Sequence, residues 1–241
     1  MFSLRNVSYA YDGCEALHGI DLDISRGESV AFIGPNGSGK STLLKLLNGI
    51  VLADTGSYVF DGKSVTRASL RDQTFARTFH KRIGFLFQNP EVQLFCPSVE
   101  EEVAFGPRQM GFTEEVVAGR SQDCLKLLDI GHLAQRPPWH LSGGEKRKVA
   151  FASILALNPD VLVLDEPMNS LDPKTKRFIR DVVLSLIAGG KTILCSTHDF
   201  AYVEGLFVRG IVISSDHAIV RDDDYQKILA DSAFLASQNI L

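Results

Sequence analysis

Apolar and polar residues alternate near the start of the chain with the period of a strand that has one buried face. Over residues 20–25 the order is Ile, Asp, Leu, Asp, Ile and Ser, and successive side chains of a strand point to opposite faces of a sheet. After a turn at residues 26–28, residues 29–33 form a short apolar run that ends at a glycine. Such a run is typical of a strand buried on both faces, as in a parallel sheet.

Similar strand patterns return in the second half of the chain, separated by helical ones. Residues 161–164, 192–196 and 211–214 each predict a strand. Between the first two, one helix face collects apolar residues at helical spacing and stops at Gly189-Gly190: Phe178, Ile179, Val182, Val183, Leu186 and Ile187. Shorter patterns predict a helix after residue 40, a strand and turn at an antiparallel edge over residues 58–62, and a last helix over residues 225–235.

Residues 89–153 have a different pattern, because prolines divide them into several helical segments with few strand signals. Alternation of strands and helices around a glycine-rich turn favours an α/β fold with a parallel sheet. We therefore predict a single domain over residues 1–241. It has an α/β core with an antiparallel β edge, and a helical subdomain over residues 89–153 is inserted in it.

Composition narrows the class of protein. The 241 residues include 25 Lys and Arg against 29 Asp and Glu, a net charge of −4, which gives no overall attraction to nucleic acid or anionic lipid. With 45% hydrophobic and 22% charged residues, the chain is globular rather than disordered or coiled-coil. No apolar run approaches the roughly 18 residues of a membrane span, and the N-terminus has no signal-peptide pattern. We expect a soluble chain whose four scattered cysteines are reduced thiols.

The clearest motif follows the apolar run at residues 29–33. It reads Gly34-Pro35-Asn36-Gly37-Ser38-Gly39-Lys40-Ser41 and fits the phosphate-binding pattern G-x-x-x-x-G-K-[ST]. Its glycines let consecutive backbone N–H groups face one phosphate, and the next helix adds its positive N-terminus. We predict that Lys40 reaches the β- and γ-phosphates, that Ser41 ligates Mg²⁺ and that Thr42 joins the nucleotide site. By itself the motif indicates an NTPase or a nucleotide kinase.

Two acids follow the predicted strand at residues 161–164. Asp165 and Glu166 come at the carboxyl end of that strand, the edge at which ligands bind in open α/β sheets. Asp165 is suited to hold the Mg²⁺ shell. Glu166 is suited to orient and polarise a water for attack on the γ-phosphorus, in a reaction dominated by positioning and charge stabilisation.

A further set of motifs carries a family resemblance. Leu141-Ser142-Gly143-Gly144-Glu145 resembles the LSGGQ signature of ATP-binding cassette (ABC) ATPases, with Glu145 where Gln is commonest. Tyr11 resembles the aromatic residue that stacks on adenine, and Gln88 resembles the Q-loop glutamine, which also reaches Mg²⁺. Ser170-Leu171-Asp172 resembles the D-loop, and His198 resembles the switch histidine. The motifs occur in the family's order and cover essentially the whole chain.

This resemblance implies how the chain works. Lys40, Glu166 and His198 would carry catalysis, and the signature would contact the γ-phosphate bound by the opposite subunit. Two chains would then hold two ATP molecules head to tail, either as a homodimer or as a heterodimer with a paralogue. The chain stops at Leu241, before the C-terminal dimer region of longer relatives, so ATP would have a larger part in closing the dimer.

The Q-loop region resembles that of energy-coupling-factor ATPases, including those of cobalt and nickel importers. In that family this segment forms a groove for cytoplasmic helices of a transmembrane coupling protein. The groove here would lie near Glu91–Phe95 and Glu100–Glu102, with Glu91-Val92 where many members have paired acids. The resemblance implies a peripheral subunit on the cytoplasmic face of the membrane that drives import of a transition-metal ion or a vitamin. Lys146, Arg147 and Lys148 are interpreted as a solvated face of the signature helix.

Two other functions are weighed against this hypothesis. A non-transport ABC ATPase acting on ribosomes or nucleic acid would have tandem cassettes or a long coiled coil, and its partner would favour a basic chain. This chain has one cassette and a negative net charge, so we expect no nucleic-acid partner. A small-molecule kinase with the same phosphate loop would not explain the signature or His198.

Overall fold

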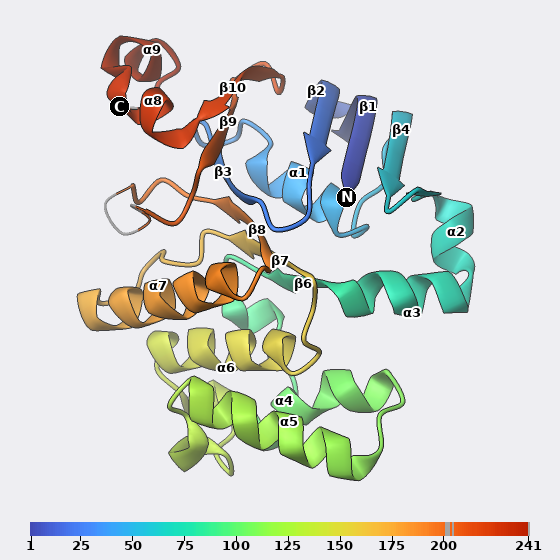
Figure 1. The fold of residues 1–241 in the computed structure, drawn as a ribbon, viewed down its shortest axis with the longest axis vertical. Helices are drawn as coiled ribbons and strands as arrows, with labels where there is room; N and C mark the ends of the chain where they lie inside the picture. Colours follow the sequence, from blue (N-terminus) through green and yellow to red (C-terminus); the bar gives the residue numbers. More distant parts are fainter. Residues whose placement is uncertain (201–202, 204, 241) are drawn as a thin grey trace.

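The computed structural model describes residues 1–200, 203 and 205–240. Its centre is a six-stranded sheet in the order β10-β9-β3-β8-β7-β6. The strands are β3 (Ser29–Ile33), β6 (Ile83–Leu86), β7 (Val161–Asp165), β8 (Thr192–Ser196), β9 (Arg209–Ile213) and β10 (Ile219–Asp224). The first five are parallel to one another, and β10 pairs antiparallel with β9. Figure 1 places this sheet across the middle of the molecule.

A second sheet is antiparallel, in the order β2-β1-β4-β5. It contains β1 (Phe2–Tyr11), β2 (Cys14–Ile24), β4 (Thr55–Phe60) and β5 (Lys63–Ser64). Together with α1 (Lys40–Leu47) it covers one face of the six-stranded sheet (Figure 1). The helices α2 (Arg67–Arg71) and α3 (Gln73–Arg82) then lead the chain from β5 to β6.

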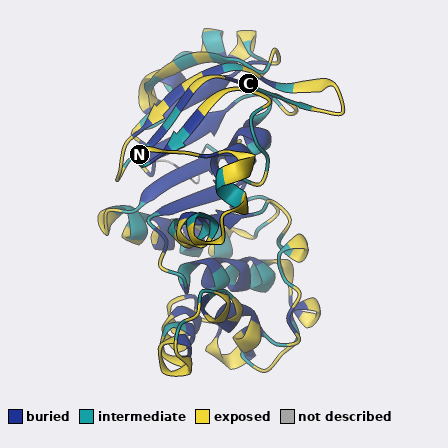
Figure 2. Cartoon of the chain, turned by 90° about the vertical axis from the view of Figure 1, so that its right-hand side faces the viewer, coloured by how far each residue is buried: buried dark blue, intermediate teal, exposed yellow. Residues whose placement is uncertain are grey.

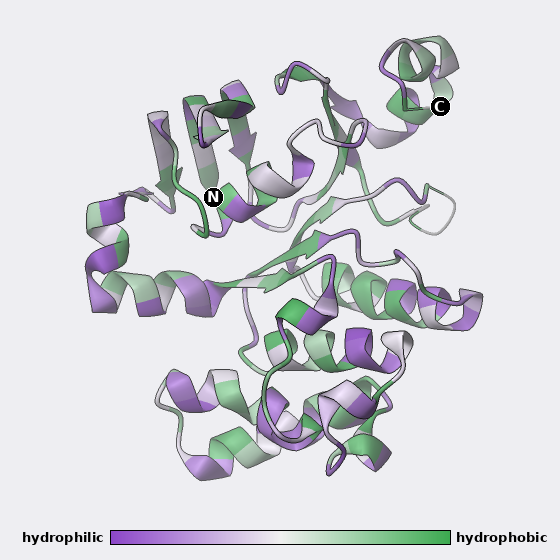
Figure 3. Ribbon diagram, turned by 180° about the vertical axis from the view of Figure 1, so that it is seen from behind, coloured by the Kyte–Doolittle hydropathy of each residue, from purple (hydrophilic) through white to green (hydrophobic). Residues whose placement is uncertain are grey.

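Alternation along the buried strands sorts their side chains between two cores. In β3, Val30 and Phe32 pack with α1 and the antiparallel sheet, whereas Ala31 and Ile33 pack toward α6 (Gly143–Leu155) and α7 (Pro173–Ala188). All residues of β3, β6, β7 and β8 are buried, as the dark strands of Figure 2 show. The same strands form the hydrophobic centre of Figure 3. Both sheet faces are therefore covered, as a parallel sheet requires.

The segment between β6 and β7 is helical. It holds α4 (Val99–Gln109), α5 (Glu114–Leu127) and α6, with short 3₁₀ helices at Pro90–Val92, Gly131–Leu133 and Pro138–His140. The three α-helices pack on one another and share the core that contains α7. None of the helices in the described residues is long and apolar enough to cross a membrane.

The predicted strands at residues 29–33, 161–164, 192–196 and 211–214 are confirmed, as is the helix after residue 40. The prediction of one helix over residues 225–235 is wrong: the structure has α8 (Tyr225–Ala230) and α9 (Ser232–Ser237). Asp231 separates them because its carboxylate accepts a 3.0 Å hydrogen bond from the backbone N–H of Phe234 and so caps α9.

Candidate active site

The phosphate loop joins β3 to α1 in a conformation that two of its glycines permit. Gly34 and Gly39 have φ values of +158° and +104°. A Cβ at Gly34 would lie 2.3 Å from the carbonyl oxygen of Ile213, and one at Gly39 would lie 2.3 Å from that of Ala16. A larger residue at either position would therefore push the loop away from the neighbouring backbone.

Lys40 is buried at the first position of α1. Its ammonium donates hydrogen bonds of 2.7 Å to the carbonyl oxygen of Gly34 and 2.9 Å to that of Pro35. Burial lowers the pKa of Lys40, and the nearby carboxylates of Glu166 and Asp165 oppose that shift. The cation thus lies inside the loop, at the positive end of the helix.

Asp165 connects the phosphate loop to the sheet. Its Oδ1 atom accepts a 2.9 Å hydrogen bond from the hydroxyl of Ser41 and a 2.6 Å hydrogen bond from that of Ser196. Ser196 pairs with Asp165 in the register of β7 and β8. The sequence patterns did not single out Ser196 as a site residue. A signal was present, because Ser196 is a polar residue at the end of a predicted strand, and the carboxyl ends of parallel strands lie at the same edge of a sheet.

Glu166 follows Asp165 in a left-handed conformation, with φ of +49°. Its backbone N–H lies 3.0 Å from the hydroxyl oxygen and 3.2 Å from the carbonyl oxygen of Ser196. Its Oε1 lies 2.8 Å from Nδ1 of His198. The Glu166 side chain is 9% exposed and that of His198 is 59% exposed. A buried carboxylate therefore contacts an imidazole that faces the solvent.

One pocket of about 380 Å³ brings most of the predicted nucleotide residues together. Its lining includes Tyr11, the loop residues 36–42, Gln88, Glu166 and His198. Tyr11 is 41% exposed. The pocket is also lined by residues that sequence analysis missed, namely Cys14, Glu15, Ala16 and His217.

The signature lies outside this pocket. Ser142 caps α6, and the carboxylate of Glu145 accepts hydrogen bonds from the Ser142 hydroxyl at 2.7 Å and its backbone N–H at 2.8 Å. A separate hollow of about 310 Å³ joins the signature to the D-loop and is lined by Gln88, Asn89, Pro90, Gly143, Arg147, Asn169, Ser170 and Leu171. Asp172 caps α7 through the N–H groups of Lys174 and Thr175. Within one chain, only Gln88 lines both hollows among the described residues.

The prediction of a solvated face at residues 146–148 is wrong. Arg147 is 3% exposed, and its guanidinium donates to the carbonyl oxygens of Phe87 at 2.8 Å and Gln88 at 2.7 Å. Burial lowers the pKa of Arg147 to about 10. Lys146 lies 2.5 Å from Glu91, and Lys148 lies over the Phe178 ring at 4.0 Å. The helix is packed on two sides, so all three cations are engaged within the chain.

The predicted partner groove also needs a correction. Glu102 is 3% exposed, and its carboxylate accepts hydrogen bonds from the backbone N–H groups of Phe95 at 2.8 Å and Cys96 at 2.7 Å. This acid fixes the loop before α4 and is not exposed for a partner. Glu91, in contrast, keeps 62% of its side chain exposed while it pairs with Lys146.

Apolar side chains are exposed around the same segment. Val92, Phe95 and Trp139 are each at least 60% exposed. Phe95 and Phe105 pack edge to face at 4.9 Å between ring centroids. Trp139, Glu91 and Lys146 line a hollow of about 360 Å³, so this face combines exposed aromatic area with an acid.

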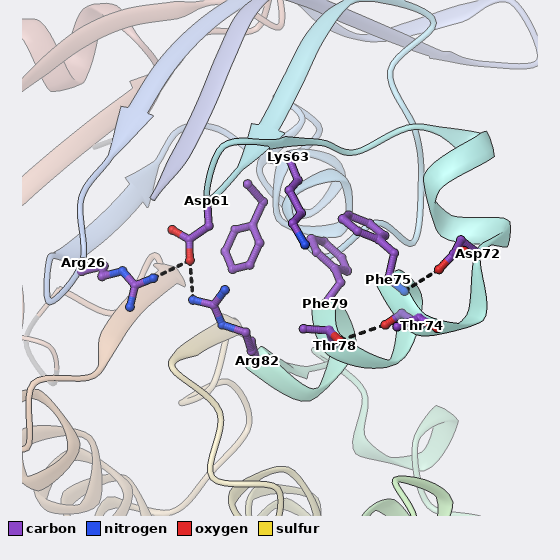
Figure 4. A pocket seen from close by; sticks show the side chains of 10 residues that line it. Arg26, Asp61, Lys63, Asp72, Thr74, Phe75, Thr78, Phe79 and Arg82 are labelled. Carbon is purple, nitrogen blue, oxygen red and sulfur yellow. Dashed lines mark hydrogen bonds and ion pairs between the residues drawn. The ribbon is translucent and has the colours of Figure 1, made fainter.

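A larger hollow, of about 630 Å³, lies beside α3. Figure 4 shows that its wall is formed by Phe75 and Phe79, and that Arg26 and Arg82 converge on Asp61. None of the predicted phosphate-contacting residues lines it. Of its two acids, Asp61 pairs with two guanidinium groups and Asp72 caps α3, so we assign this hollow no part in nucleotide chemistry.

The phosphate loop, the acids after β7 and the histidine after β8 define a P-loop nucleotide hydrolase. Residues 17–169 match the family described as ABC transporter. The chain belongs to this family and is one of its ATPases, an ATP-binding subunit of a transporter.

Two relatives whose names state a function are similar to this chain over most of its length. The chain is 44% identical over 222 residues to the nickel import ATP-binding protein LarO of Lactiplantibacillus plantarum, and the match covers 92% of each chain. It is 43% identical over 220 residues to the energy-coupling factor transporter ATP-binding protein EcfA of Methanothermobacter thermautotrophicus, covering 91% of this chain and 70% of the relative.

Solved structures agree with this assignment. CbiO1 of Clostridium perfringens, described as part of the ABC transporter complex cbiONQ, aligns with a TM-score of 0.82 at 33% identity, covering 99% of this chain and 94% of that one. A cassette solved as a dimer after hydrolysis, with ADP and Pi bound, aligns with a TM-score of 0.82 at 29% identity, covering 93% and 98%.

Proposed function

We propose that this chain is the motor subunit of an importer of the energy-coupling-factor type, with a transition-metal ion such as nickel or cobalt, or a vitamin, as cargo. The observation that carries the catalytic part is the 2.8 Å contact between Glu166 and His198 at the rim of the phosphate-loop pocket. The nickel import named for LarO supports a metal ion as cargo, and the similarity to EcfA supports the energy-coupling-factor type.

ATP would lie along the pocket, with its base on Tyr11 and its phosphates in the loop of residues 34–41. Lys40 would leave its loop carbonyls for the β- and γ-phosphates. Glu166 would orient a water and accept its proton as the oxygen attacks the γ-phosphorus and the bond to ADP breaks. His198 would hold the carboxylate in place and contact the γ-phosphate. Positioning and charge therefore supply most of the rate.

The residues around Asp165 fit a magnesium ion. A carboxylate and a serine hydroxyl meet at 2.9 Å beside the phosphate loop, and Mg²⁺ prefers oxygen ligands of this kind together with substrate phosphates. Ser41, Asp165 and Gln88 would hold the ion, which would neutralise charge on the β- and γ-phosphates.

The signature is the reason to propose a head-to-tail dimer. Ser142 and Gly143 lie at the N-terminus of α6, an anion-binding position, yet neither lines the nucleotide pocket of its own chain. A second copy of the chain or a paralogous cassette would bring its γ-phosphate to Leu141–Glu145 and the D-loop, Ser170–Asp172. The helical region over residues 89–153 would move as a subdomain when the dimer closes.

The exposed face around Glu91, Phe95 and Trp139 would receive cytoplasmic helices of a transmembrane coupling protein. Aromatic area flanked by an acid suits a helix with apolar and basic residues. This chain would then be a peripheral protein on the cytoplasmic side of the membrane.

The test is a pull-down from detergent-solubilised native membranes with Glu166→Gln as bait and ATP·Mg²⁺ present, read by mass spectrometry. We expect polytopic membrane proteins to be recovered, with or without a second cassette. Glu91→Lys in the same background should lose them while it keeps the nucleotide-dependent dimer. Recovery of ribosomes or nucleic acid without membrane proteins would contradict the transport function and leave the ATPase unaffected.

A further inference from the structure

His217 has a left-handed backbone conformation, with φ of +62°. Nine described residues other than glycine have a positive φ, and six of them are Asn or Asp, which tolerate the left-handed region best. The other three are Glu166, Ser170 and His217, with φ of +49°, +59° and +62°. Glu166 carries the proposed chemistry, and Ser170 belongs to the D-loop. Histidine is, with Asn and Asp, among the residues enriched in this region, so the evidence for a function of His217 comes from its surroundings.

The position of His217 supplies a second observation. It lies in the turn between β9 and β10 and lines the same pocket as Tyr11, Lys40 and Glu166. His217 belongs neither to the phosphate loop nor to the catalytic groups, so those roles do not explain its presence in the pocket.

Backbone hydrogen bonds hold the turn that carries His217. The backbone N–H of His217 donates to the carbonyl oxygen of Ser214 at 3.0 Å, and the N–H of Ser214 donates to that of Ala218 at 3.0 Å. Across the pocket wall, the N–H of His18 donates to the carbonyl oxygen of His217 at 2.9 Å. That bond attaches the turn to β2, two residues beyond Ala16, which also lines the pocket.

One polar atom of the ring is unused within the protein. Nδ1 of His217 is buried and has no hydrogen-bond partner among the described residues. A buried polar group without a partner is costly. Because the residue lines the pocket, a rotation of the ring would bring this nitrogen to a ligand, which would offset the cost.

We propose that His217 is a base-recognition residue of the nucleotide site, forming a wall for the purine together with Tyr11. This inference rests on the proposed nucleotide site. Stacking on Tyr11 tolerates any base, because every base has a π-face. An imidazole adds a hydrogen-bonding nitrogen and so contacts the edge of the base as well as its surface.

The test measures binding of two probes, Mg·ATP and Mg·tripolyphosphate, by calorimetry on the full chain. The variant is His217→Gly, because glycine suits the left-handed backbone and the fold is retained. We expect ATP affinity to fall roughly tenfold, the order of losing one base contact, while tripolyphosphate affinity stays unchanged. His217→Asn, which also tolerates this backbone, should recover part of the ATP affinity through its amide.

Two controls separate this inference from the nucleotide site itself. Asp129→Gly changes another left-handed residue (φ +53°) outside the pocket and should alter neither affinity. Lys40→Ala should weaken both probes, and if it weakens neither, the proposed nucleotide site is wrong. Unchanged ATP affinity in His217→Gly, or an equal loss for ATP and tripolyphosphate, would overturn the base-recognition role while the site stands.

Discussion

The guanidinium of Arg147 donates a 2.7 Å hydrogen bond to the backbone carbonyl oxygen of Gln88. A buried cation of the signature helix therefore holds the backbone of the residue that lines both the nucleotide pocket and the signature hollow. Through this contact, a movement of the signature helix would be passed to the nucleotide pocket without a change in any group that touches phosphate.

Arg147→Met should lower both stability and turnover. The carbonyl oxygens of Phe87 and Gln88 lose charged donors, which we expect to cost about 1.5–3 kcal/mol in the free energy of unfolding, as measured by urea denaturation. Lys148→Met, one residue along the same helix, loses only the contact with the Phe178 ring and should cost less than about 1 kcal/mol. Equal losses for the two variants would contradict the structural role of Arg147.

Glu166→Gln should bind ATP but hydrolyse it about 10² to 10⁴ times more slowly, because a positioned base is lost. With ATP bound, the variant should remain dimeric on size-exclusion chromatography. Lys40→Ala should lose ATP binding altogether, which separates binding from chemistry. Turnover close to that of the wild type in Glu166→Gln would be evidence against this carboxylate as the base.

Sequence patterns predicted the α/β fold and named most of the residues that line the candidate nucleotide pocket, because the phosphate-binding motif is encoded in contiguous residues. What they missed depends on contacts between distant segments. Ser196 matters only because β8 lies beside β7 in register with Asp165. The burial of Arg147 follows from packing against the segment after β6, which a charge run does not reveal. The strand β6 itself has four residues, too few for a period to separate strand from helix.

Ser142→Arg should abolish ATP-dependent dimerisation without stopping ATP binding by the single chain. The added side chain would fill the position at which the opposite γ-phosphate is proposed to lie. The substitution also removes a helix cap, a loss of about 1 kcal/mol, so Ser142→Asn serves as the control that keeps capping ability. Full hydrolysis by Ser142→Arg would be incompatible with head-to-tail catalysis.

The hydrogen bonds between Glu145 and Ser142, which cap α6, should be lost only at low pH. Hydrogen bonds from the Ser142 hydroxyl and backbone hold the pKa of Glu145 below its usual value. A carboxyl with a depressed folded-state pKa contributes stability that is complete above its unfolded pKa and is lost as pH falls through the folded one. Below roughly pH 4.3, the unperturbed value, Glu145→Gln should therefore lose less stability than the wild type. A parallel pH dependence of the two chains would show that the carboxylate does not support the cap.

Glu102→Gln tests the corrected role of the acid at the start of α4. The Oε2 atom of its carboxylate accepts both backbone N–H groups, those of Phe95 and Cys96, and the neutral oxygen of an amide accepts such bonds about half as strongly as a carboxylate oxygen. We expect a loss of about 1.5–3 kcal/mol in the free energy of unfolding. Hydrogen exchange at Phe95 and Cys96 should become faster. Glu101→Gln, an exposed neighbour, should change neither quantity.

Capture of the membrane partner by Glu102→Gln should fall only as far as the loop that holds Phe95 loosens, because the carboxylate itself is buried. Complete loss of the partner with normal exchange at Phe95 would instead make Glu102 a direct contact.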